Sequence, residues 1–302
     1  MIVVTGPTGV GKTNIAIELA LRLNAEIVSV DSRQIYRFMD IGTAKPTLEQ
    51  RRLVPHHLID IVYPDEYYSV YNFRNDALRT ISQIRARGKI PLLVGGTGLY
   101  IDALTRGIFE GAPRNEQLRQ ELLEKESREP GRLRKMLEGI DPEAASRIHV
   151  NDLKRTIRAL EVWFQTGCTI SQLQRASKPS GNFTIVVLTR DRRELYDRIN
   201  VRVERMIEEG LVEEVKSLLK MGYSKDLNAL KTIGYQEVIE YLEGKESFER
   251  TVEKIKRNTR HFARRQLIWF RRYRDATWLN VSDEKVLEKL MEMVSEDAQK
   301  NS

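Results

Sequence analysis

Residues 2–13 read Ile-Val-Val-Thr-Gly-Pro-Thr-Gly-Val-Gly-Lys-Thr, and they are the most informative segment of the chain for its fold. The apolar run 2–5 predicts a short buried strand, and residues 6–13 fit the pattern G-x-x-x-x-G-K-[ST]. Helical spacing of apolar residues follows over 12–23. A strand that enters a glycine-rich loop and leaves it as a helix is the setting in which this pattern binds phosphate groups.

The loop 6–13 is expected to cradle a di- or triphosphate. Its glycines let backbone N–H groups turn toward an anion, and the N-terminus of the following helix adds partial positive charge. Lys12 is expected to reach a terminal phosphate, and the Thr13 hydroxyl is expected to ligate Mg²⁺. The pattern does not by itself identify the ligand as ATP. The predicted phosphate-binding residues are Gly6, Pro7, Thr8, Gly9, Val10, Gly11, Lys12 and Thr13.

Strands and helices alternate in the residues that follow the loop. A second buried strand is expected over 27–30, ending at Asp31, and a third over 90–94, which runs into Gly-Gly-Thr-Gly. Between these two strands, residues 73–87 have helical spacing. This order of elements predicts a parallel sheet covered by helices.

Residues 113–182 interrupt the alternation. They contain amphipathic helical segments separated by turns, and no convincing strand. A β run returns at 183–188 and is followed by helical patterns over 195–221 and 251–274. We therefore predict an α/β fold with a P-loop NTPase-like parallel-sheet core covered by helices, formed by 1–112 and 183–302. An all-helical insertion domain is predicted at 113–182.

The charge of the chain is concentrated near its C-terminus. The net charge is +7, and the segment 251–275 alone holds nine Lys or Arg and two acids. A patch this local favours a polyanionic partner. Cys168 is the only cysteine, which excludes an internal disulfide. No apolar run reaches the roughly 20 residues that cross a bilayer, and no signal peptide is recognisable, so a cytoplasmic monomer without membrane contact is expected.

Two polar side chains follow predicted strand ends. In an open α/β sheet the end of the second strand lies beside the phosphate loop, so Asp31 is expected where a second substrate approaches. An NTPase usually carries an acid at the end of a later strand, but here that strand ends in glycines, which favours a transferase. Asp31 is a candidate general base, metal ligand or cap of the next turn. The Thr97 hydroxyl is a candidate donor to a leaving oxygen.

Several unusual strings occur together outside the P-loop. They are Asp31–Tyr36 (DSRQIY), Met39–Pro46 (MDIGTAKP), His56–Asp60 (HHLID), Gly95–Tyr100 (GGTGLY), Asn151-Asp152 with Arg158–Val162 (RALEV), Arg202-Val203, Gly210-Leu211, Gly234–Glu237 (GYQE) and Arg264–Arg271 (RRQLIWFR). Together they resemble the tRNA dimethylallyltransferases, also called tRNA isopentenyltransferases. The resemblance runs from residue 2 to about residue 279. One departure is Phe38, because the family usually has glycine at this position.

The resemblance implies transfer of a dimethylallyl group from dimethylallyl diphosphate to the N6 amine of the adenosine adjacent to the anticodon, with Mg²⁺ as cofactor. The implied partner is the tRNA anticodon stem-loop, clasped by the core and the insertion. Asp31 is the implied base, while Thr97 and Arg202 act with Thr13 on Mg²⁺ and diphosphate. The implied tRNA-binding residues are Asp31, Ser32, Arg33, Gln34, Thr97, Arg119, Lys154, Arg155, Thr156, Ile157, Arg158, Lys231, Thr232, Ile233, Gly234, Tyr235 and Gln236.

The chemistry adds two further expectations. A helix that is apolar on one side and basic on the other can dock to the core and face phosphates, which predicts an RNA-facing stripe of Arg257, His261, Arg264 and Arg271. The apolar tail of the donor needs a slot, for which Ile41, Leu99 and Tyr100 are candidates.

Three other interpretations stay open from the residues alone. A small-molecule kinase shares the P-loop and an acid at the second strand end, although it does not need the basic helix. A prenyltransferase that acts on free adenine nucleotides would not need the basic helix either. The third interpretation is a non-catalytic RNA-binding protein, in which Asp31 would perform no chemistry.

Overall fold

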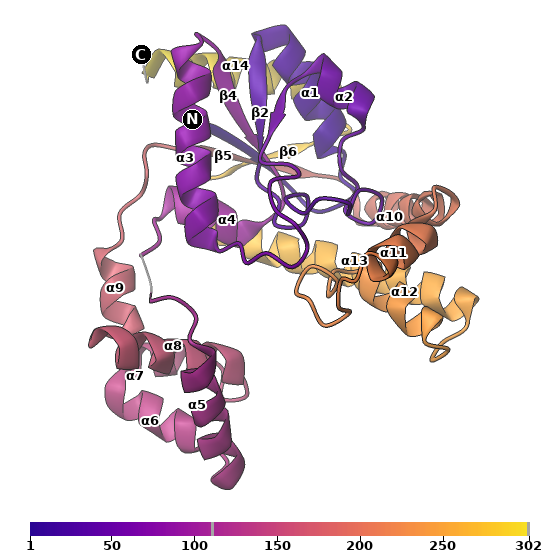
Figure 1. Ribbon diagram of the computed structural model, residues 1–302. Helices are drawn as coiled ribbons and strands as arrows, with labels where there is room; N and C mark the ends of the chain where they lie inside the picture. Colours follow the sequence, from indigo (N-terminus) through magenta and orange to yellow (C-terminus); the bar gives the residue numbers. More distant parts are fainter. Residues whose placement is uncertain (110–111, 301–302) are drawn as a thin grey trace. The chain divides into compact units, whose positions relative to one another are not determined.

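The computed structural model describes residues 1–109 and 112–300, and its centre is a six-stranded parallel sheet (Figure 1). The strand order is β3-β2-β4-β1-β5-β6, and all neighbouring strands pair in parallel. This arrangement confirms the predicted fold class. The strands are β1 (Ile2–Thr5), β2 (Ala25–Ser29), β3 (His56–His57), β4 (Ile90–Val94), β5 (Thr184–Thr189) and β6 (Thr277–Asn280).

The core of the sheet is buried on both faces, which is why its strands are nearly continuous apolar runs. Ile2 and Val4 of β1 pack with one group of helices, and Val3, between them, belongs to the cluster on the opposite face. Helices of this compact unit are α1 (Lys12–Leu23), α2 (Leu48–Leu53), α3 (Val70–Ala86), α4 (Gly98–Thr105), α10 (Arg192–Glu208), α11 (Leu211–Lys220), α12 (Tyr235–Leu242), α13 (Phe248–Phe270) and α14 (Val286–Lys300).

The two faces of the sheet have different covers. Ala16 and Leu19 of α1 join Leu290 of α14 in one cluster. Phe73 of α3 and Ile101 of α4 join the cluster on the other face. A third cluster lies beyond the strand ends, where the segment after β2 packs against α11, α12 and α13. The carboxyl ends of β1, β2 and β4 are therefore flanked by packed elements and can hold a site.

Residues 106–180 form a second compact unit, whereas the insertion was expected at 113–182. Its described residues hold helices and no strand, around a core that includes Leu122, Leu137 and Leu160. The two ends of this unit meet, because a Cβ placed on Gly107 would lie 2.2 Å from the carbonyl oxygen of Lys178. Its helices are α5 (Glu116–Arg128), α6 (Arg132–Ile140), α7 (Pro142–Arg147), α8 (Leu153–Thr166) and α9 (Ile170–Ala176).

Some element boundaries differ from the sequence predictions. The helical pattern over 195–221 is two helices, α10 and α11, because Gly210 has φ +99° and ends the first of them. The helix expected over 73–87 begins earlier, at Val70, where Ser69 caps it by accepting from the Asn72 N–H. Strands β3 and β6 were not predicted. Across the described residues, every helix is too short or too polar to cross a bilayer.

A matched pair of glycine substitutions tests how tightly the strand ends are packed. A Cβ on Gly95 would lie 2.1 Å from the Val30 carbonyl oxygen, so Gly95→Ala is expected to lower the free energy of unfolding by about 1–3 kcal/mol. Gly139, near the end of α6, has no atom within 4 Å of such a Cβ. Gly139→Ala is expected to raise the free energy of unfolding by about 0.5 kcal/mol. Urea unfolding of both variants measures these changes, and equal effects would contradict the prediction.

Candidate active site

The P-loop comprises residues 6–13, of which 6–11 connect β1 to α1 and Lys12 and Thr13 are the first two residues of α1. Gly6, Gly9 and Gly11 all have positive φ, as expected where N–H groups turn inward. The Lys12 Nζ donates to the carbonyl oxygens of Gly6 (2.8 Å) and Pro7 (3.0 Å). The ammonium group therefore lies over its own loop, where it can exchange these carbonyls for a phosphate.

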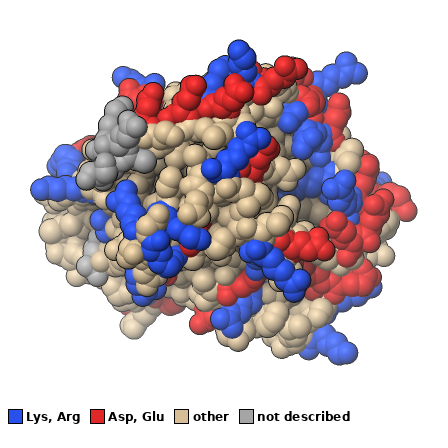
Figure 2. Space-filling view, turned by 90° about the horizontal axis from the view of Figure 1, so that it is seen from above, with Lys and Arg blue, Asp and Glu red and all other residues tan. Residues whose placement is uncertain are grey.

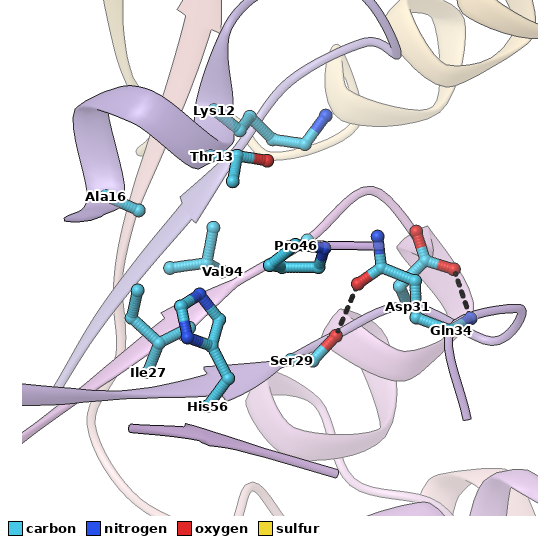
Figure 3. A pocket seen from close by; sticks show the side chains of 11 residues that line it. Lys12, Thr13, Ala16, Ile27, Ser29, Asp31, Gln34, Pro46, His56 and Val94 are labelled. Carbon is cyan, nitrogen blue, oxygen red and sulfur yellow. Dashed lines mark hydrogen bonds between the residues drawn. The ribbon is translucent and has the colours of Figure 1, made fainter. Parts of the chain in front are cut away.

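A small pocket opens beside this loop (Figure 3). Lys12 and Thr13 line one side of it, and Asp31 and Gln34 line another, so polar groups from α1 and from the loop after β2 meet there. The remaining wall is mostly apolar. The full lining consists of Lys12, Thr13, Ala16, Ile27, Ser29, Asp31, Gln34, Pro46, His56, Val94 and Gly95.

Asp31 caps the turn that follows it. Its Oδ1 accepts from the N–H groups of Arg33 (2.8 Å) and Gln34 (3.4 Å). Oδ2 makes no hydrogen bond to any residue that the structure describes. Capping and chemistry are thus compatible, because the cap uses one carboxylate oxygen and leaves the other for a substrate.

Thr97 joins the glycine-rich turn after β4 to the loop that carries Asp31. Its Oγ1 accepts from the N–H of Ser32 at 3.0 Å and donates to the Ser32 hydroxyl at 3.3 Å. Its own N–H donates to the carbonyl of Val30 at 3.2 Å. The Thr97 hydroxyl therefore binds the residue that directly follows Asp31 in the chain.

Two cations and one carboxylate act on one another at this site. Burial and the Arg202 guanidinium lower the pKa of Lys12 to about 8, while the Asp31 carboxylate opposes this effect. Burial also lowers the pKa of Arg202, again opposed by Asp31. The side chain of the half-buried Arg202 makes no hydrogen bond to any residue that the structure describes. The site thus holds more positive than negative charge, which suits an anionic ligand.

The sequence profile described as IPP transferase matches residues 34–273, which is most of the chain. The chain belongs to the IPP transferase family. A second profile, described as isopentenyl transferase, matches residues 1–54, which include the P-loop and Asp31.

Full-length relatives support the IPP transferase assignment. The chain is 65% identical to the tRNA dimethylallyltransferase of Thermotoga neapolitana, over 97% of this chain and 97% of the relative. It is similar in structure to the tRNA isopentenylpyrophosphate transferase of Bacillus halodurans (41% identity, TM-score 0.74, 99% of this chain and 96% of the other). A eukaryotic dimethylallyltransferase described as acting on tRNA matches with 29% identity and TM-score 0.80, over 100% of this chain and 79% of that one. These matches favour a transferase over the kinase interpretation.

In this IPP transferase the predicted tRNA-binding segments of the first unit mix exposed and buried residues. Lys231 and Gln236 are exposed, Ile233 is half-buried, and Thr232, Gly234 and Tyr235 are buried. The Tyr235 hydroxyl donates to Glu214 Oε1 at 2.6 Å. The buried side chains hold the segment in place, and the side chains of Lys231 and Gln236 are available to a partner in the free chain.

The loop residues Arg33 and Gln34 have protein partners as well. Arg33 Nη1 donates to the Asn228 carbonyl at 2.9 Å, which ties the loop to the segment before Lys231. The Gln34 side chain accepts from the Ser29 hydroxyl at 3.3 Å and donates to the Thr43 and Ala44 carbonyls. Both side chains therefore stabilise the loop in the free protein.

In the second unit, the predicted contacts divide in the same way. Lys154 and Arg155 are exposed, and Thr156 and Ile157 are buried. Arg119 and Arg158 both form ion pairs with the fully buried Glu161, at 2.7 and 2.6 Å. Glu161 carries a pKa lowered to about 2 by these hydrogen bonds, which outweigh its burial. The two guanidinium groups around one carboxylate leave a net positive charge on this part of α8 and α5.

Phe38, the departure found in the sequence, lies where the backbone has a conformation that favours glycine. Phe38 has φ +66°, a left-handed conformation that glycine adopts without cost. Its side chain is 43% exposed, and its ring lies 5.8 Å from that of Tyr63. Arg37 stacks over the same Tyr63 ring at 4.6 Å. The family's usual glycine is thus replaced here by a residue that adds an aromatic surface.

The sequence analysis did not identify Glu214, which holds the loop after Asp31. Its carboxylate accepts from three successive N–H groups, those of Asp40 (2.8 Å), Ile41 (2.8 Å) and Gly42 (3.2 Å). An acid on an amphipathic helix carries no local signal of such a role. The candidate tail residues Ile41, Leu99 and Tyr100 do not line this pocket, and their assignment to the tail stays a prediction.

Lys12 is expected to make diphosphate binding depend on pH. Its pKa of about 8 in the free chain rises when diphosphate binds, because the anion stabilises the charged ammonium. Affinity is therefore complete below pH 8 and falls by up to about tenfold per pH unit above it. Calorimetric titration with inorganic diphosphate, over a range that spans this pKa, measures the loss.

Lys12→Arg is the matched control, since arginine stays charged throughout this range. The pH dependence of the affinity of Lys12→Arg comes from the titration of diphosphate itself, and it is subtracted from the pH dependence measured for the wild type. A wild-type curve parallel to that of Lys12→Arg would show that Lys12 does not titrate in the site.

Proposed function

We propose that this IPP transferase transfers the dimethylallyl group of dimethylallyl diphosphate to the N6 amine of the adenosine adjacent to the anticodon in tRNA. The observation that carries the proposal is the shared pocket, in which Lys12 and Thr13 of the P-loop face the carboxylate of Asp31. Relatives with 63–65% identity over nearly their whole length bear the name tRNA dimethylallyltransferase. A leaving-group site and a base thus stand on opposite sides of one reaction space.

The leaving group is stabilised electrostatically. As the allylic carbon–oxygen bond breaks, negative charge grows on the diphosphate, and Lys12, Arg202 and the P-loop N–H groups are placed to stabilise it. The bond between N6 and the allylic carbon forms as the adenine amine loses one proton. The free Oδ2 of Asp31 accepts that proton or orients the amine, while Thr97 donates toward the departing oxygen.

Mg²⁺ fits the oxygen donors present. Thr13 Oγ1 and the Asp31 carboxylate line the same pocket, and Mg²⁺ prefers oxygen ligands, several of them from substrate phosphates and water. No cluster of three His, Cys, Asp or Glu that could hold a metal exists in the described part of the chain. When bound, Mg²⁺ would supply further positive charge to the diphosphate. Thr13 is the residue we assign to hold it.

The apolar wall of the pocket suits the prenyl tail. Ala16, Ile27 and Val94 line it beside the P-loop lysine, so a five-carbon group can lie against them while its diphosphate reaches Lys12. We assign these three residues, in place of Ile41, Leu99 and Tyr100, to the tail.

A stripe of arginines on α13 supplies a surface for the tRNA backbone. Arg257, Arg264 and Arg271 are spaced by seven residues, are exposed, and form no ion pair with any described residue. By contrast, Lys256 on the same helix pairs with Glu204 at 2.8 Å. Figure 2 shows Lys and Arg interspersed with Asp and Glu on one face of the molecule, so a positive charge alone does not mark an RNA contact. We also assign tRNA contacts to exposed Lys231 and Gln236 of the first unit and, separately, to exposed Lys154 and Arg155 of the second unit.

Asp31→Asn tests the base. The amide keeps an oxygen that can cap the following turn, but it cannot accept a proton from the amine. We expect kcat for dimethylallyl transfer to fall by about 10²–10⁴-fold, while tRNA affinity stays within about twofold of wild type. Mass spectrometry of the tRNA and a binding titration measure the two quantities.

Asp283→Asn is the control, because Asp283 caps Lys285 N–H at 2.9 Å in the same way but lies outside the pocket. It should retain full activity. If Asp31→Asn weakens tRNA binding as much as it slows transfer, Asp31 is not acting as a chemical base.

Salt dependence tests the arginine stripe. Each phosphate contact contributes about 0.7–0.9 to the slope of log affinity for tRNA against log salt concentration. Arg264→Gln is expected to reduce that slope by about one contact. Arg22→Gln, at the end of α1 remote from the P-loop, should leave the slope unchanged. Identical slopes for wild type and Arg264→Gln would exclude Arg264 from the tRNA surface.

A further inference from the structure

Gln266 connects two loops of the active site through one side chain. It lies on α13 and is only 7% exposed. Its Oε1 accepts from the N–H of Thr8 at 2.9 Å, and its Nε2 donates to the carbonyl of Gly96, also at 2.9 Å. Thr8 belongs to the P-loop, and Gly96 belongs to the glycine-rich turn after β4. Both ends of a buried amide are therefore used to hold loops that come from different strands.

The glycine-rich turn is pressed against α13 at this point. A Cβ on Gly96 would lie 2.4 Å from Gln266 Nε2, and one on Gly98 would lie 2.3 Å from the Trp269 ring. The Tyr273 hydroxyl also donates to the Gly98 carbonyl, at 3.2 Å. The turn and α13 are thus in direct contact, and neither glycine leaves room for a side chain.

A polar residue in this position needs a reason beyond packing. A buried amide is costly unless its donor and acceptor are both satisfied, and an apolar side chain of similar volume would fill the space without that cost. What an apolar side chain cannot do is fix the distance between Thr8 and Gly96. That distance matters because Gly96 precedes Thr97, whose hydroxyl holds the Ser32 N–H beside Asp31.

We propose that Gln266 is a positioning residue that keeps the P-loop, which grips the leaving diphosphate, in register with the turn that supports Thr97 and the Asp31 loop. The proposal rests on the proposed function for its effect on catalysis. The connection runs from Thr8 through Gln266 to Gly96, and from Thr97 to Ser32, by hydrogen bonds of 2.9–3.0 Å. Gln266 itself acts through these neighbours and has no assigned contact with substrate.

Gln266→Met removes both hydrogen bonds and preserves most of the volume. We expect kcat for dimethylallyl transfer to tRNA to fall by roughly 10- to 100-fold, as a misplacement of reacting groups would cause, with KM for tRNA within about twofold. A kcat within about twofold of wild type would overturn the proposal.

Ala263→Gly is the matched control, because Ala263 is fully buried on the same helix, one turn earlier. It lowers stability without removing a side-chain hydrogen bond to either loop, and its melting temperature is compared with that of Gln266→Met. If Ala263→Gly reduces kcat as much as Gln266→Met does, the effect is loss of stability, and the proposal fails.

Gln266→Glu provides a signature that a packing role cannot produce. A protonated carboxyl group can accept from the Thr8 N–H and donate to the Gly96 carbonyl, whereas the carboxylate would face that carbonyl without a proton. Burial raises the pKa of a carboxyl group, so the protonated form increases as pH falls. We expect activity relative to wild type, compared at each pH, to rise by at least about fivefold between pH 8 and pH 6. A flat or falling ratio would overturn the proposal.

Hydrogen exchange separates this proposal from the proposed function. Loss of the Gln266 bond should speed exchange in a peptide that covers the P-loop, at least about tenfold in Gln266→Met and not in Ala263→Gly. Unchanged exchange would refute the bridge whatever the activity. If wild type transfers no dimethylallyl group while exchange responds as expected, the proposed function fails and the bridge stands.

Discussion

Parallel pairing of the strands is the constraint on which the site depends. Because β1, β2 and β4 point the same way, the residues that follow them meet at one edge of the sheet. The P-loop, Asp31 and Thr97 come from these three strand ends. Burial on both faces keeps the strands in register, so each loop leaves the sheet from a fixed point. The charges of the site are therefore positioned by the sheet before any ligand arrives.

The sequence was sufficient for those parts of the site that are encoded locally. The P-loop could be predicted because a strand, a glycine-rich turn and a helix follow one another within a few residues. Asp31 could be predicted because it directly follows a buried apolar strand. The two-residue strand β3 could not be predicted, since it depends on its pairing with β2. Strand β6 is similar, because it forms through its pairing with β5, which is remote in sequence. Long-range pairing leaves no periodic trace in a short segment.

The same reasoning explains which site residues were missed. Glu214 and Gln266 act on loops that lie more than a hundred residues away along the chain. The apolar wall of Ala16, Ile27 and Val94 is contributed by three separate elements, and each residue alone reads as ordinary core. Arg119 and Arg158 were predicted as tRNA contacts, which stays a prediction, and the structure adds that both pair with the buried Glu161. Sequence patterns identify charged residues but not the partner that each one finds.

The close approach of Gly107 to Lys178 has a consequence for how this chain could have been assembled. The first and last segments of the second unit lie against each other at Gly107 and Lys178, and the unit has a core of its own. A segment with adjacent ends and its own core has the properties of an inserted domain. Insertions or deletions in such a segment need not alter the order of the sheet, so its length and surface are free to change while the strand ends that carry the P-loop, Asp31 and Thr97 stay the same.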